Sequence, residues 1–576
     1  MSGRYDGQLT VVADPELEAA QPNHTITLDA RQAQPLDVRV PRDVDVNGMS
    51  VGLQIERPEL GDFQIEDTMV FARGATNGSV PAVPMSVLPF EPPERGHGNI
   101  DSYWSLVSPR ARAAVIDPSH YDLPVSLMDG SARIDSRQTL PLVDLGDGSP
   151  EAYDGVDVTG KLVLVRETDV IRFGDQAATA QEHGAAALLV SSSQPGMFLG
   201  GDAFSDIPVL ATSQSAGDRL RADLARRTVR VELSGSPAAT YLYDLAFRER
   251  DRLRSSTIYH PDDLARVQVD FHATVDQEDP QRFWGLRFPD WGEVCGYCGS
   301  VAREGEDFHD GRTRIDYLTP GVRWSDYLLQ DSWLEWRAVR SYETGSSETS
   351  WGRAPVAPGV PIDSGRVSKR VGDTLQLRLA GYTDGDPSHV LDLWNGWFHG
   401  SATVSRDGTA LGDCVETYAL SCDIDVPADS ETYTLTADLP APTFSKAVQD
   451  STTTWTFHSA PDETVLPLLD IDYGLPVSLQ NTLPADSRTQ LGLDVRRQPG
   501  SAGGPITSVQ VEQSFDDGTT WHPVRVIRLG NGSYTTWLSQ PELADTNGYG
   551  SLRVTATDAA GNQIEQEVRR AYALVD

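Results

Sequence analysis

The sequence is poor in lysine, in cysteine and in long apolar runs. Lysine occurs only at Lys161, Lys369 and Lys446, while Lys+Arg total 47 and Asp+Glu total 84. The resulting formal net charge of −37 argues against nucleic acid and anionic lipid as partners, because like charges repel. No run approaches the roughly 18 apolar residues of a membrane helix, so we expect no membrane-spanning segment.

The motifs of hydrolytic enzymes are missing or incomplete. The sequence contains no Gly-x-Ser-x-Gly elbow, no phosphate-binding loop and no His-Glu-x-x-His. Asp363, in a D-S-G triplet, and His399, in H-G-S, stand in the order of a serine-peptidase triad, but no serine motif follows them. We therefore expect no catalytic, cofactor-binding or metal-binding residues, and the chain is more consistent with a binding protein than with an enzyme.

The four cysteines form two local pairs, Cys295/Cys298 and Cys414/Cys422. Together they could form a four-thiolate zinc site, but the seven residues within the second pair exceed the usual spacing. Separately they could form two small disulfides, the second linking the strands of a hairpin. A redox-active C-G-Y-C at the first pair is a third interpretation, although no thioredoxin-like βαβ pattern surrounds it.

Two acidic turns are candidate calcium ligands. Asp384 and Asp386 flank a glycine, and Asp516 and Asp517 precede one. Carboxylates at this spacing can bind calcium, but the same residues are typical of turns that need no ion. We expect turns at both places.

One stretch in the second quarter of the chain alternates strands with helices. VDVTGKLVLVR at 156–166 predicts a turn and a buried strand, and apolar positions within 173–184 share one face of a helix that ends at His183-Gly184. Residues 185–190 and 207–210 predict two more buried strands, and 215–227 a second helix. The order is that of an α/β unit with a parallel sheet.

This pattern, from V-x-G-K-[IL]-V-L-V-R to the I-P-V at 207–209, resembles the protease-associated (PA) domain, which we expect at residues 136–236. Such domains are inserted in, or appended to, secreted peptidases and sorting receptors. The resemblance implies contact with a substrate or partner, and no chemistry.

Four further segments, in the same order, resemble the region that follows the catalytic domain in large actinobacterial subtilisin-like serine peptidases. They are TITLDAR with PLDV at 25–38, RIDYLTPGVRW at 314–324, VQVEQSFDDGTTW at 509–521, and LRVTATDAAGNQIEQ with RRAYAL at 552–574. Because that family is secreted, the resemblance favours disulfides over zinc at all four cysteines. The chain begins in strand-like sequence without a leader, which suggests that it starts within a domain of a longer peptidase.

The expected fold class is mainly β: several β-sandwich (fibronectin/immunoglobulin-like) modules with one α/β PA-like domain inserted. Around the PA-like domain we expect β-rich regions at 1–135 and 237–365, a β-sandwich-like domain at 366–462, and a fibronectin/immunoglobulin-like domain at 463–576. The implied function is that of a secreted, non-catalytic accessory region of a subtilisin-like peptidase. Its partners would be protein or peptide substrates, or a subtilase catalytic domain. The alternative is a free-standing secreted binding or structural protein.

Overall fold

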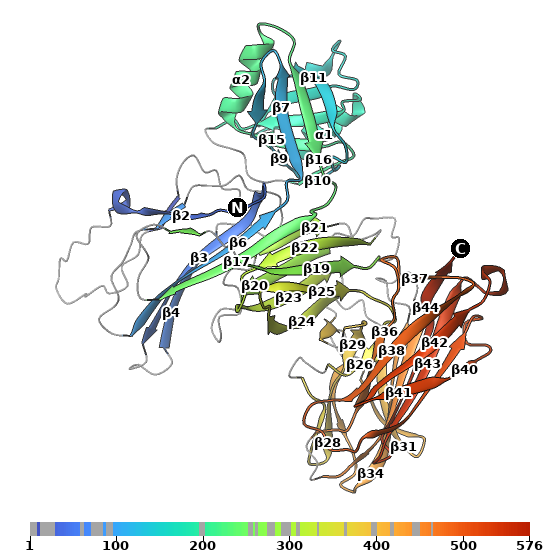
Figure 1. Ribbon diagram of the computed structural model, residues 1–576. Helices are drawn as coiled ribbons and strands as arrows, with labels where there is room; N and C mark the ends of the chain where they lie inside the picture. The colour runs from blue at the N-terminus through green and yellow to red at the C-terminus, as the bar shows by residue number, and fades with distance from the viewer. Residues whose placement is uncertain are drawn as a thin grey trace.

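The computed structural model describes residues 9–11, 29–57, 63–70, 85–87, 96–194, 202–250, 257–259, 263–273, 283–289, 301–306, 311–330, 333–361, 366–386, 388–392, 400–414, 420–440, 448, 450–461 and 465–576. Strands dominate this part of the chain, and its two α-helices both lie in one insert. Figure 1 shows the insert at the top, a long twisted sheet below it and a large β-sandwich at the lower right. The predicted fold class is confirmed: the chain is mainly β, with one mixed α/β part and antiparallel sheets of immunoglobulin-like type.

A seven-stranded sheet carries the insert. In spatial order it is β25-β19-β22-β17-β6-β3-β4, and its strands are β3 (Asp45–Arg57), β4 (Phe63–Val70), β6 (His97–Val107), β17 (Tyr241–Arg250), β19 (Ala265–Phe271), β22 (Arg312–Leu318) and β25 (Gly345–Trp351). Its central strands β6 and β17 are antiparallel neighbours, with Val107 opposite Leu242, although the whole insert lies between them in sequence. One sheet thus combines strands that the sequence places in two regions, 1–135 and 237–365.

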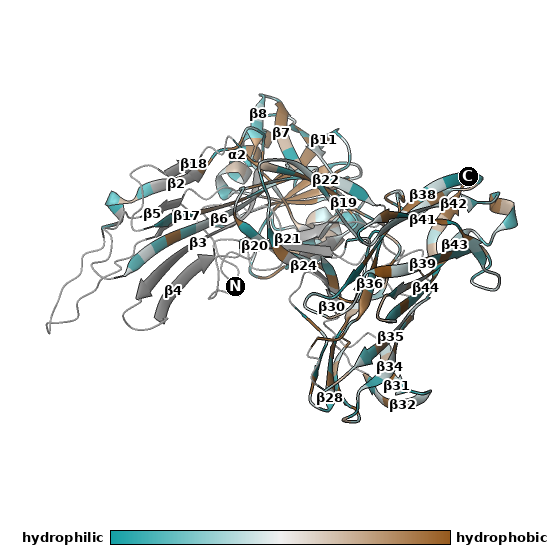
Figure 2. Cartoon of the chain, turned by 60° about the horizontal axis from the view of Figure 1, so that its bottom comes forward, coloured by the Kyte–Doolittle hydropathy of each residue, from teal (hydrophilic) through white to brown (hydrophobic). Residues whose placement is uncertain are grey.

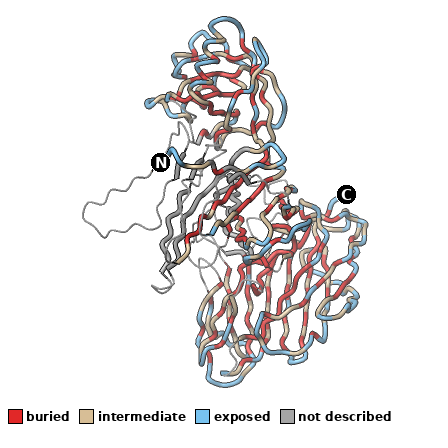
Figure 3. Tube along the Cα trace, turned by 60° about the vertical axis from the view of Figure 1, so that its left-hand side comes forward, coloured by how far each residue is buried: buried red, intermediate tan, exposed pale blue. Residues whose placement is uncertain are grey.

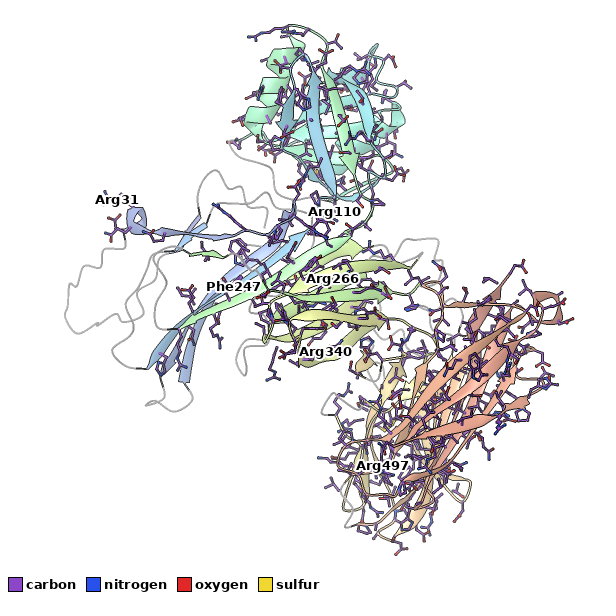
Figure 4. The ribbon with its side chains drawn as sticks, in the orientation of Figure 1. Arg31, Arg110, Phe247, Arg266, Arg340 and Arg497 are labelled. Atoms are coloured by element: carbon purple, nitrogen blue, oxygen red, sulfur yellow. A yellow bond between two sulfur atoms is a disulfide. The ribbon has the colours of Figure 1, made fainter. Side chains whose placement is uncertain are left out.

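The insert leaves and re-enters this sheet at one point. The backbone N–H of Ser108 donates to the carbonyl of Tyr241 at 2.9 Å, and the Ser236 N–H donates to the carbonyl of Arg110 at 3.2 Å. Figure 4 shows Arg110 at this root, between the sheet and the insert. The insert is therefore a side branch of the sheet rather than a link between two halves.

A second seven-stranded sheet has the order β21-β20-β23-β24-β30-β29-β26. Its strands are β20 (Phe283–Pro289), β21 (Val301–Glu306), β23 (Arg323–Gln330), β24 (Trp333–Ser341), β26 (Ala357–Gly359), β29 (Ala380–Thr383) and β30 (His389–Asp392). A buried cluster of charged side chains joins it to the first sheet, and we call the two sheets together the central sandwich.

Arg287 of β20 is the centre of that cluster and is 3% exposed. Its guanidinium donates to Asp244 of β17 at 3.0 Å, to Asp316 of β22 at 2.9 Å, and to Asp326 of β23. Burial by itself would lower the pKa of Arg287, but attraction to Asp326 and Asp316 raises it overall, so the guanidinium stays charged. Arg314, which donates to Asp316 at 2.6 Å, supplies a second positive charge.

The insert is built on an eight-stranded sheet in the order β8-β7-β16-β11-β12-β13-β15-β9. Its strands are β7 (Ala111–Asp117), β8 (Tyr121–Leu123), β9 (Ser126–Leu127), β11 (Gln138–Asp144), β12 (Leu162–Arg166), β13 (Ala187–Ser191), β15 (Val209–Thr212) and β16 (Arg230–Gly235). The four strands from β11 to β15 are parallel to one another. The sheet includes residues 111–127, which precede the expected start of the PA-like domain at residue 136.

Two helices cover opposite faces of this sheet. Leu162 and Leu164 of β12 belong to the apolar cluster that includes α2 (Gln214–Leu224), whereas Val163 and Val165 belong to the cluster that includes α1 (Phe173–Glu182). Successive side chains of a strand point to opposite faces, so a continuous apolar run is expected of a strand covered on both sides. Figure 3 shows the resulting buried interior of the insert in red.

The predicted helix end is confirmed. Gly184 follows α1 with φ of +78°, the left-handed conformation that glycine adopts without a Cβ penalty. At the start of α2, the Ser213 hydroxyl accepts a hydrogen bond from the Ala216 N–H at 3.1 Å, which is a helix N-cap.

The C-terminal sandwich has one large sheet shared by two expected domains. Its order is β32-β31-β34-β35-β44-β43-β39-β40 with β37 beside β44, and its strands are β31 (Ser401–Arg406), β32 (Thr409–Cys414), β34 (Glu431–Pro440), β35 (Asp450–Ser459), β37 (Thr482–Pro484), β39 (Ile506–Ser514), β40 (His522–Val524), β43 (Tyr549–Asp558) and β44 (Gln563–Val575). Antiparallel pairing of β35 with β44 joins the regions 366–462 and 463–576.

Two smaller sheets complete the C-terminal sandwich. One has the order β36-β38-β42-β41 and the other β27-β28-β33; their strands are β36 (Leu469–Gly474), β38 (Ser487–Arg497), β41 (Val526–Gly530), β42 (Ser533–Gln540), β27 (Lys369–Val371), β28 (Thr374–Arg378) and β33 (Ser421–Asp425). The fully buried Trp455 of β35 donates from Nε1 to the carbonyl of Leu469 at 2.7 Å and so ties the large sheet to β36. Hydrophobic and hydrophilic residues interleave along these strands in Figure 2.

Further short strands pair outside these sheets. They are β1 (Leu9–Val11), β2 (Gln34–Val38), β5 (Met85–Val87) and β18 (Thr257–Tyr259) in one sheet, and β10 (Asp129–Ser131) with β14 (Asp202–Ser205) in the insert.

Replacing Arg287 by methionine should destabilise the central sandwich by about 3–5 kcal/mol, because three buried carboxylates would lose their shared cation. Native-state hydrogen exchange of β17 and β22 measures the loss as a lower free energy of opening. Arg172→Met is the control, since the Arg172 side chain is 90% exposed and its loss should change stability by less than about 0.5 kcal/mol. Equal protection in both variants would contradict a stabilising role for the cluster.

Candidate binding surface on the insert

Polar side chains gather where the parallel strands of the insert end. β11, β12, β13 and β15 end at Asp144, Arg166, Ser191 and Thr212. Because the strands are parallel, these ends meet at one edge of the sheet, and the carboxyl edge of an α/β sheet is where such folds place their binding residues. We call it the carboxyl edge.

Arg221 of α2 joins two strands at the carboxyl edge. Its Nε donates to Asp144 Oδ1 at 3.2 Å, and its Nη2 donates to the Ser191 hydroxyl at 3.0 Å. Gly217 allows α2 to approach this closely, since a Cβ there would come within 2.4 Å of the Ser191 Cβ. The helix is thus held over the strand ends.

Two buried side chains hold the loops that follow the strands. Glu167 is 6% exposed, and its Oε2 accepts hydrogen bonds from the N–H and the hydroxyl of Ser193, each at 3.1 Å. Gln176 of α1 is fully buried and donates to the carbonyls of Asp147 at 2.7 Å and Arg166 at 3.0 Å. The loops after β11, β12 and β13 are therefore anchored to the same edge.

The loop after β12 projects an apolar side chain into solvent. The Thr168 hydroxyl oxygen accepts hydrogen bonds from the N–H groups of Val170 at 3.3 Å and Ile171 at 2.9 Å, which closes a tight turn. This turn leaves Val170 91% exposed. We call residues 167–172 the contact loop, because binding residues concentrate on loops that a rigid scaffold holds in place.

His183 is the histidine nearest in sequence to the contact loop, and it lies at the edge of the sheet opposite the carboxyl edge. His183 follows α1, its Nδ1 is 2.9 Å from the Thr179 carbonyl oxygen, and its ring lies 4.7 Å from that of Tyr153. Burial raises the pKa of Tyr153 to about 12, so this phenol is neutral. The serines of the carboxyl edge instead donate to carbonyl and carboxylate oxygens, an arrangement suited to binding rather than to nucleophilic catalysis.

The carboxyl edge also faces away from the central sandwich. β16 runs antiparallel to β11, with Leu233 opposite Gln138 and Arg230 opposite Pro141. The root of the insert, just after β16, therefore lies near the start of β11. Asp144 and the contact loop lie at the far end.

Comparison with known families identifies this part of the chain. Residues 138–220 match the model described as "PA domain". The insert contains a PA domain. The match spans less than half of the chain and confirms the resemblance that the sequence shows at the V-x-G-K and I-P-V segments. No curated protein matches the chain.

Part of the chain is similar to solved structures of peptidases. The aminopeptidase from Aneurinibacillus sp. strain AM-1 is 18% identical, with 27% of this chain and 35% of that chain covered and a TM-score of 0.20. The zinc aminopeptidase from Bacillus subtilis is 16% identical, with 26% of this chain and 35% of that chain covered and a TM-score of 0.19. The subtilisin-like protease Apa1 from Pseudoalteromonas sp. AS-11 is 17% identical, with 23% of this chain and 36% of that chain covered and a TM-score of 0.18. This chain spans only about a third of the length of each.

The structure places one of the two predicted cysteine pairs. Cys414 and Cys422 form a disulfide with a Cα–Cα distance of 5.7 Å. The expectation that it links the strands of one hairpin is wrong, because β32 pairs with β31 and β33 pairs with β28. The disulfide instead joins the edges of two different sheets. Cys295 and Cys298 lie outside the described residues.

The other candidate residues divide between turns and undescribed segments. Asp363 and His399 lie outside the described residues, so the triad interpretation is not tested there. Asp384 Oδ1 accepts from the Asp386 N–H at 2.8 Å, and Asp516 Oδ1 accepts from the Thr520 N–H at 2.9 Å. Both aspartates thus take part in turn hydrogen bonds. Within the part of the chain that the structure describes, no three His, Cys, Asp or Glu side chains are grouped for a metal ion.

Replacing Arg221 by methionine should loosen the carboxyl edge, because Asp144 and the Ser191 hydroxyl would lose a charged donor. We expect a loss of about 1–3 kcal/mol, seen as faster hydrogen exchange around residues 142–146 and 189–193. Arg226→Met, on the exposed segment after α2, is the matched control. If both variants exchange alike at these strand ends, Arg221 does not organise the surface.

Proposed function

We propose that this chain is a non-catalytic accessory region of a secreted subtilisin-like serine peptidase, and that its PA domain contacts protein substrates or a partner domain. The observation that carries the proposal is the placement of the contact loop. An anchored loop with a nearly fully exposed valine stands at the end of the PA domain that is farthest from the root. Such a position leaves it accessible to large proteins.

Several observations support this function. The PA domain is a side branch, so a protein bound to its carboxyl edge would not displace either strand of the β6–β17 pair. The Cys414–Cys422 disulfide supports an oxidising, extracellular location. The co-linear segments described from sequence resemble the region that follows the catalytic domain in such peptidases. As a separate finding, the described part of the chain has no helix with the length and hydrophobicity of a membrane span.

Casein binding by the purified full chain tests the role of the contact loop. Val170→Asp should weaken binding by about fivefold, because a charge would replace an apolar contact. Val156→Asp is the matched control: Val156 is 39% exposed in the same domain but precedes β12, at the opposite edge. Biolayer interferometry measures both affinities.

The same preparation tests the absence of catalysis. We expect no casein hydrolysis that a serine-directed phosphonate inhibits. Inhibitor-sensitive hydrolysis would contradict a non-catalytic role, and Asp363 and His399 would then be the first residues to replace. Equal weakening of casein binding by Val170→Asp and Val156→Asp would contradict the proposed role of the contact loop. If neither substitution changed casein binding, the alternative of a free-standing binding protein would be favoured.

A further inference from the structure

The C-terminal sandwich carries a groove far from the PA domain in sequence. Its volume is about 790 Å³, and it is lined by residues of both sheets, among them Arg488, His522, Arg525, Ile527 and Trp537. β40 is an edge strand of the large sheet, and β41 is an edge strand of the four-stranded sheet. The groove thus opens where two sheet edges meet, and a volume of this size accommodates several residues of a peptide.

The charges of this region are distributed unevenly. Eight arginines lie within residues 465–576, all of which the structure describes. Five form ion pairs with carboxylates: Arg496 with Asp472, Arg497 with Asp558, Arg553 with Glu567, Arg569 with Glu567, and Arg570 with Asp517. In this range Arg488, Arg525 and Arg528 form none. Figure 4 labels Arg497, one of the paired arginines, in the same sandwich.

Two of the three arginines without a carboxylate partner lie at the edge of the four-stranded sheet, because Arg525 immediately precedes the edge strand β41 and Arg528 lies on it. Arg488 lies on the inner strand β38, with its guanidinium 5.7 Å from the ring centroid of Trp537 on β42.

The groove lining also contains two carboxylates, Asp516 and Asp545, of which Asp516 accepts hydrogen bonds from Thr520 within its own turn. At β41 itself, Arg525 and Arg528 have no carboxylate partner and leave a local positive site in a chain whose net charge is −37. A site of this kind attracts an acidic ligand.

β41 offers backbone groups as well as charge. It pairs with β42 on one side only, so the N–H and C=O groups of its other side have no strand partner. Ile527 is 46% exposed and Leu529 66% exposed, whereas the neighbouring edge strand β40 contains Pro523, which blocks pairing. An open edge with exposed apolar side chains is the structure to which an extended peptide adds as a further strand.

The side chains on the two faces of β41 favour a peptide over other acidic ligands. Ile527 shares the outward face with Trp537, because Ile527 lies opposite Thr535, two residues before Trp537 on β42. Val526 packs against the core on the other face, and Arg528 follows it two residues later. Arg525 and Arg528 therefore lie on opposite faces, and a β-strand, whose side chains alternate between faces, can present carboxylates to both.

We propose that the open edge of β41 binds an extended acidic peptide segment, which adds a strand to the four-stranded sheet with carboxylates at Arg525 and Arg528 and apolar side chains beside Ile527 and Trp537. This site lies outside the PA domain. The proposal does not depend on the proposed function and holds for a free-standing binding protein as well.

The test uses the full chain and a fluorescent peptide, acetyl-Glu-Glu-Val-Val-Glu-Glu-Val, followed by fluorescence anisotropy. Arg525→Glu/Arg528→Glu should weaken binding at least about tenfold, and added salt should weaken binding to the unchanged chain. Arg31→Glu/Arg137→Glu changes the net charge equally at two side chains that are 89% and 73% exposed and lie outside the contact loop, and should leave affinity unchanged. Unchanged far-ultraviolet circular dichroism verifies the fold of each variant.

Two control ligands separate strand addition from simple charge attraction. The same peptide with alternate backbone nitrogens methylated cannot donate to β41 and should not bind, and the lysine-for-glutamate peptide should not bind either. Equal binding of the methylated peptide, tighter binding of tri-galacturonate, or full affinity in Arg525→Glu/Arg528→Glu would overturn the proposal. Sedimentation showing a dimer that this variant dissociates would assign the edge to a second copy and overturn it too.

Discussion

The antiparallel pairing of β6 with β17 is the constraint on which the arrangement of the chain depends. It closes the sheet across the base of the PA domain, so that the entry and exit of the insert lie one strand apart. The central sheet is therefore continuous, and the insert need only be stable in itself. Since β16 runs antiparallel to β11, the same geometry directs the carboxyl edge and the contact loop away from the root.

The central sandwich is joined by charge as well as by apolar packing. Arg287 brings together aspartates from β17, β22 and β23, and the hydroxyls of Tyr103 and Tyr342 donate to Asp244 at 3.1 Å and Asp326 at 3.0 Å. Such a network is costly to bury and is satisfied only when all of its strands are in register. It thus fixes the relation of the two sheets more specifically than interchangeable apolar contacts would.

Local patterns in the sequence predict the PA domain well and the sheets around it poorly. The runs at 162–166 and 185–190, and the glycine at 184, determine their own strands and helix end through short-range chemistry. The pairings β6–β17 and β35–β44 connect residues that are distant in sequence, and no local pattern encodes them. The Cys414–Cys422 disulfide joins two different sheets, and this too depends on strand pairings that no local pattern encodes. The V-x-G-K and I-P-V segments identify the PA domain, but the sequence gives no indication that Val170 is exposed or that Arg525 has no carboxylate partner.

Excision of the insert tests the central claim most directly. Because Ser108 and Tyr241 are hydrogen-bonded neighbours, residues 109–239 can be replaced by a short glycine turn without breaking the central sheet. Binding of casein to the full and the excised chains should then be compared by biolayer interferometry, with hydrogen exchange of β6 and β17 as the measure of the remaining fold. We predict that casein binding is lost while β6 and β17 keep their protection. Undiminished casein affinity in a correctly folded excised chain would contradict an accessory function for the PA domain.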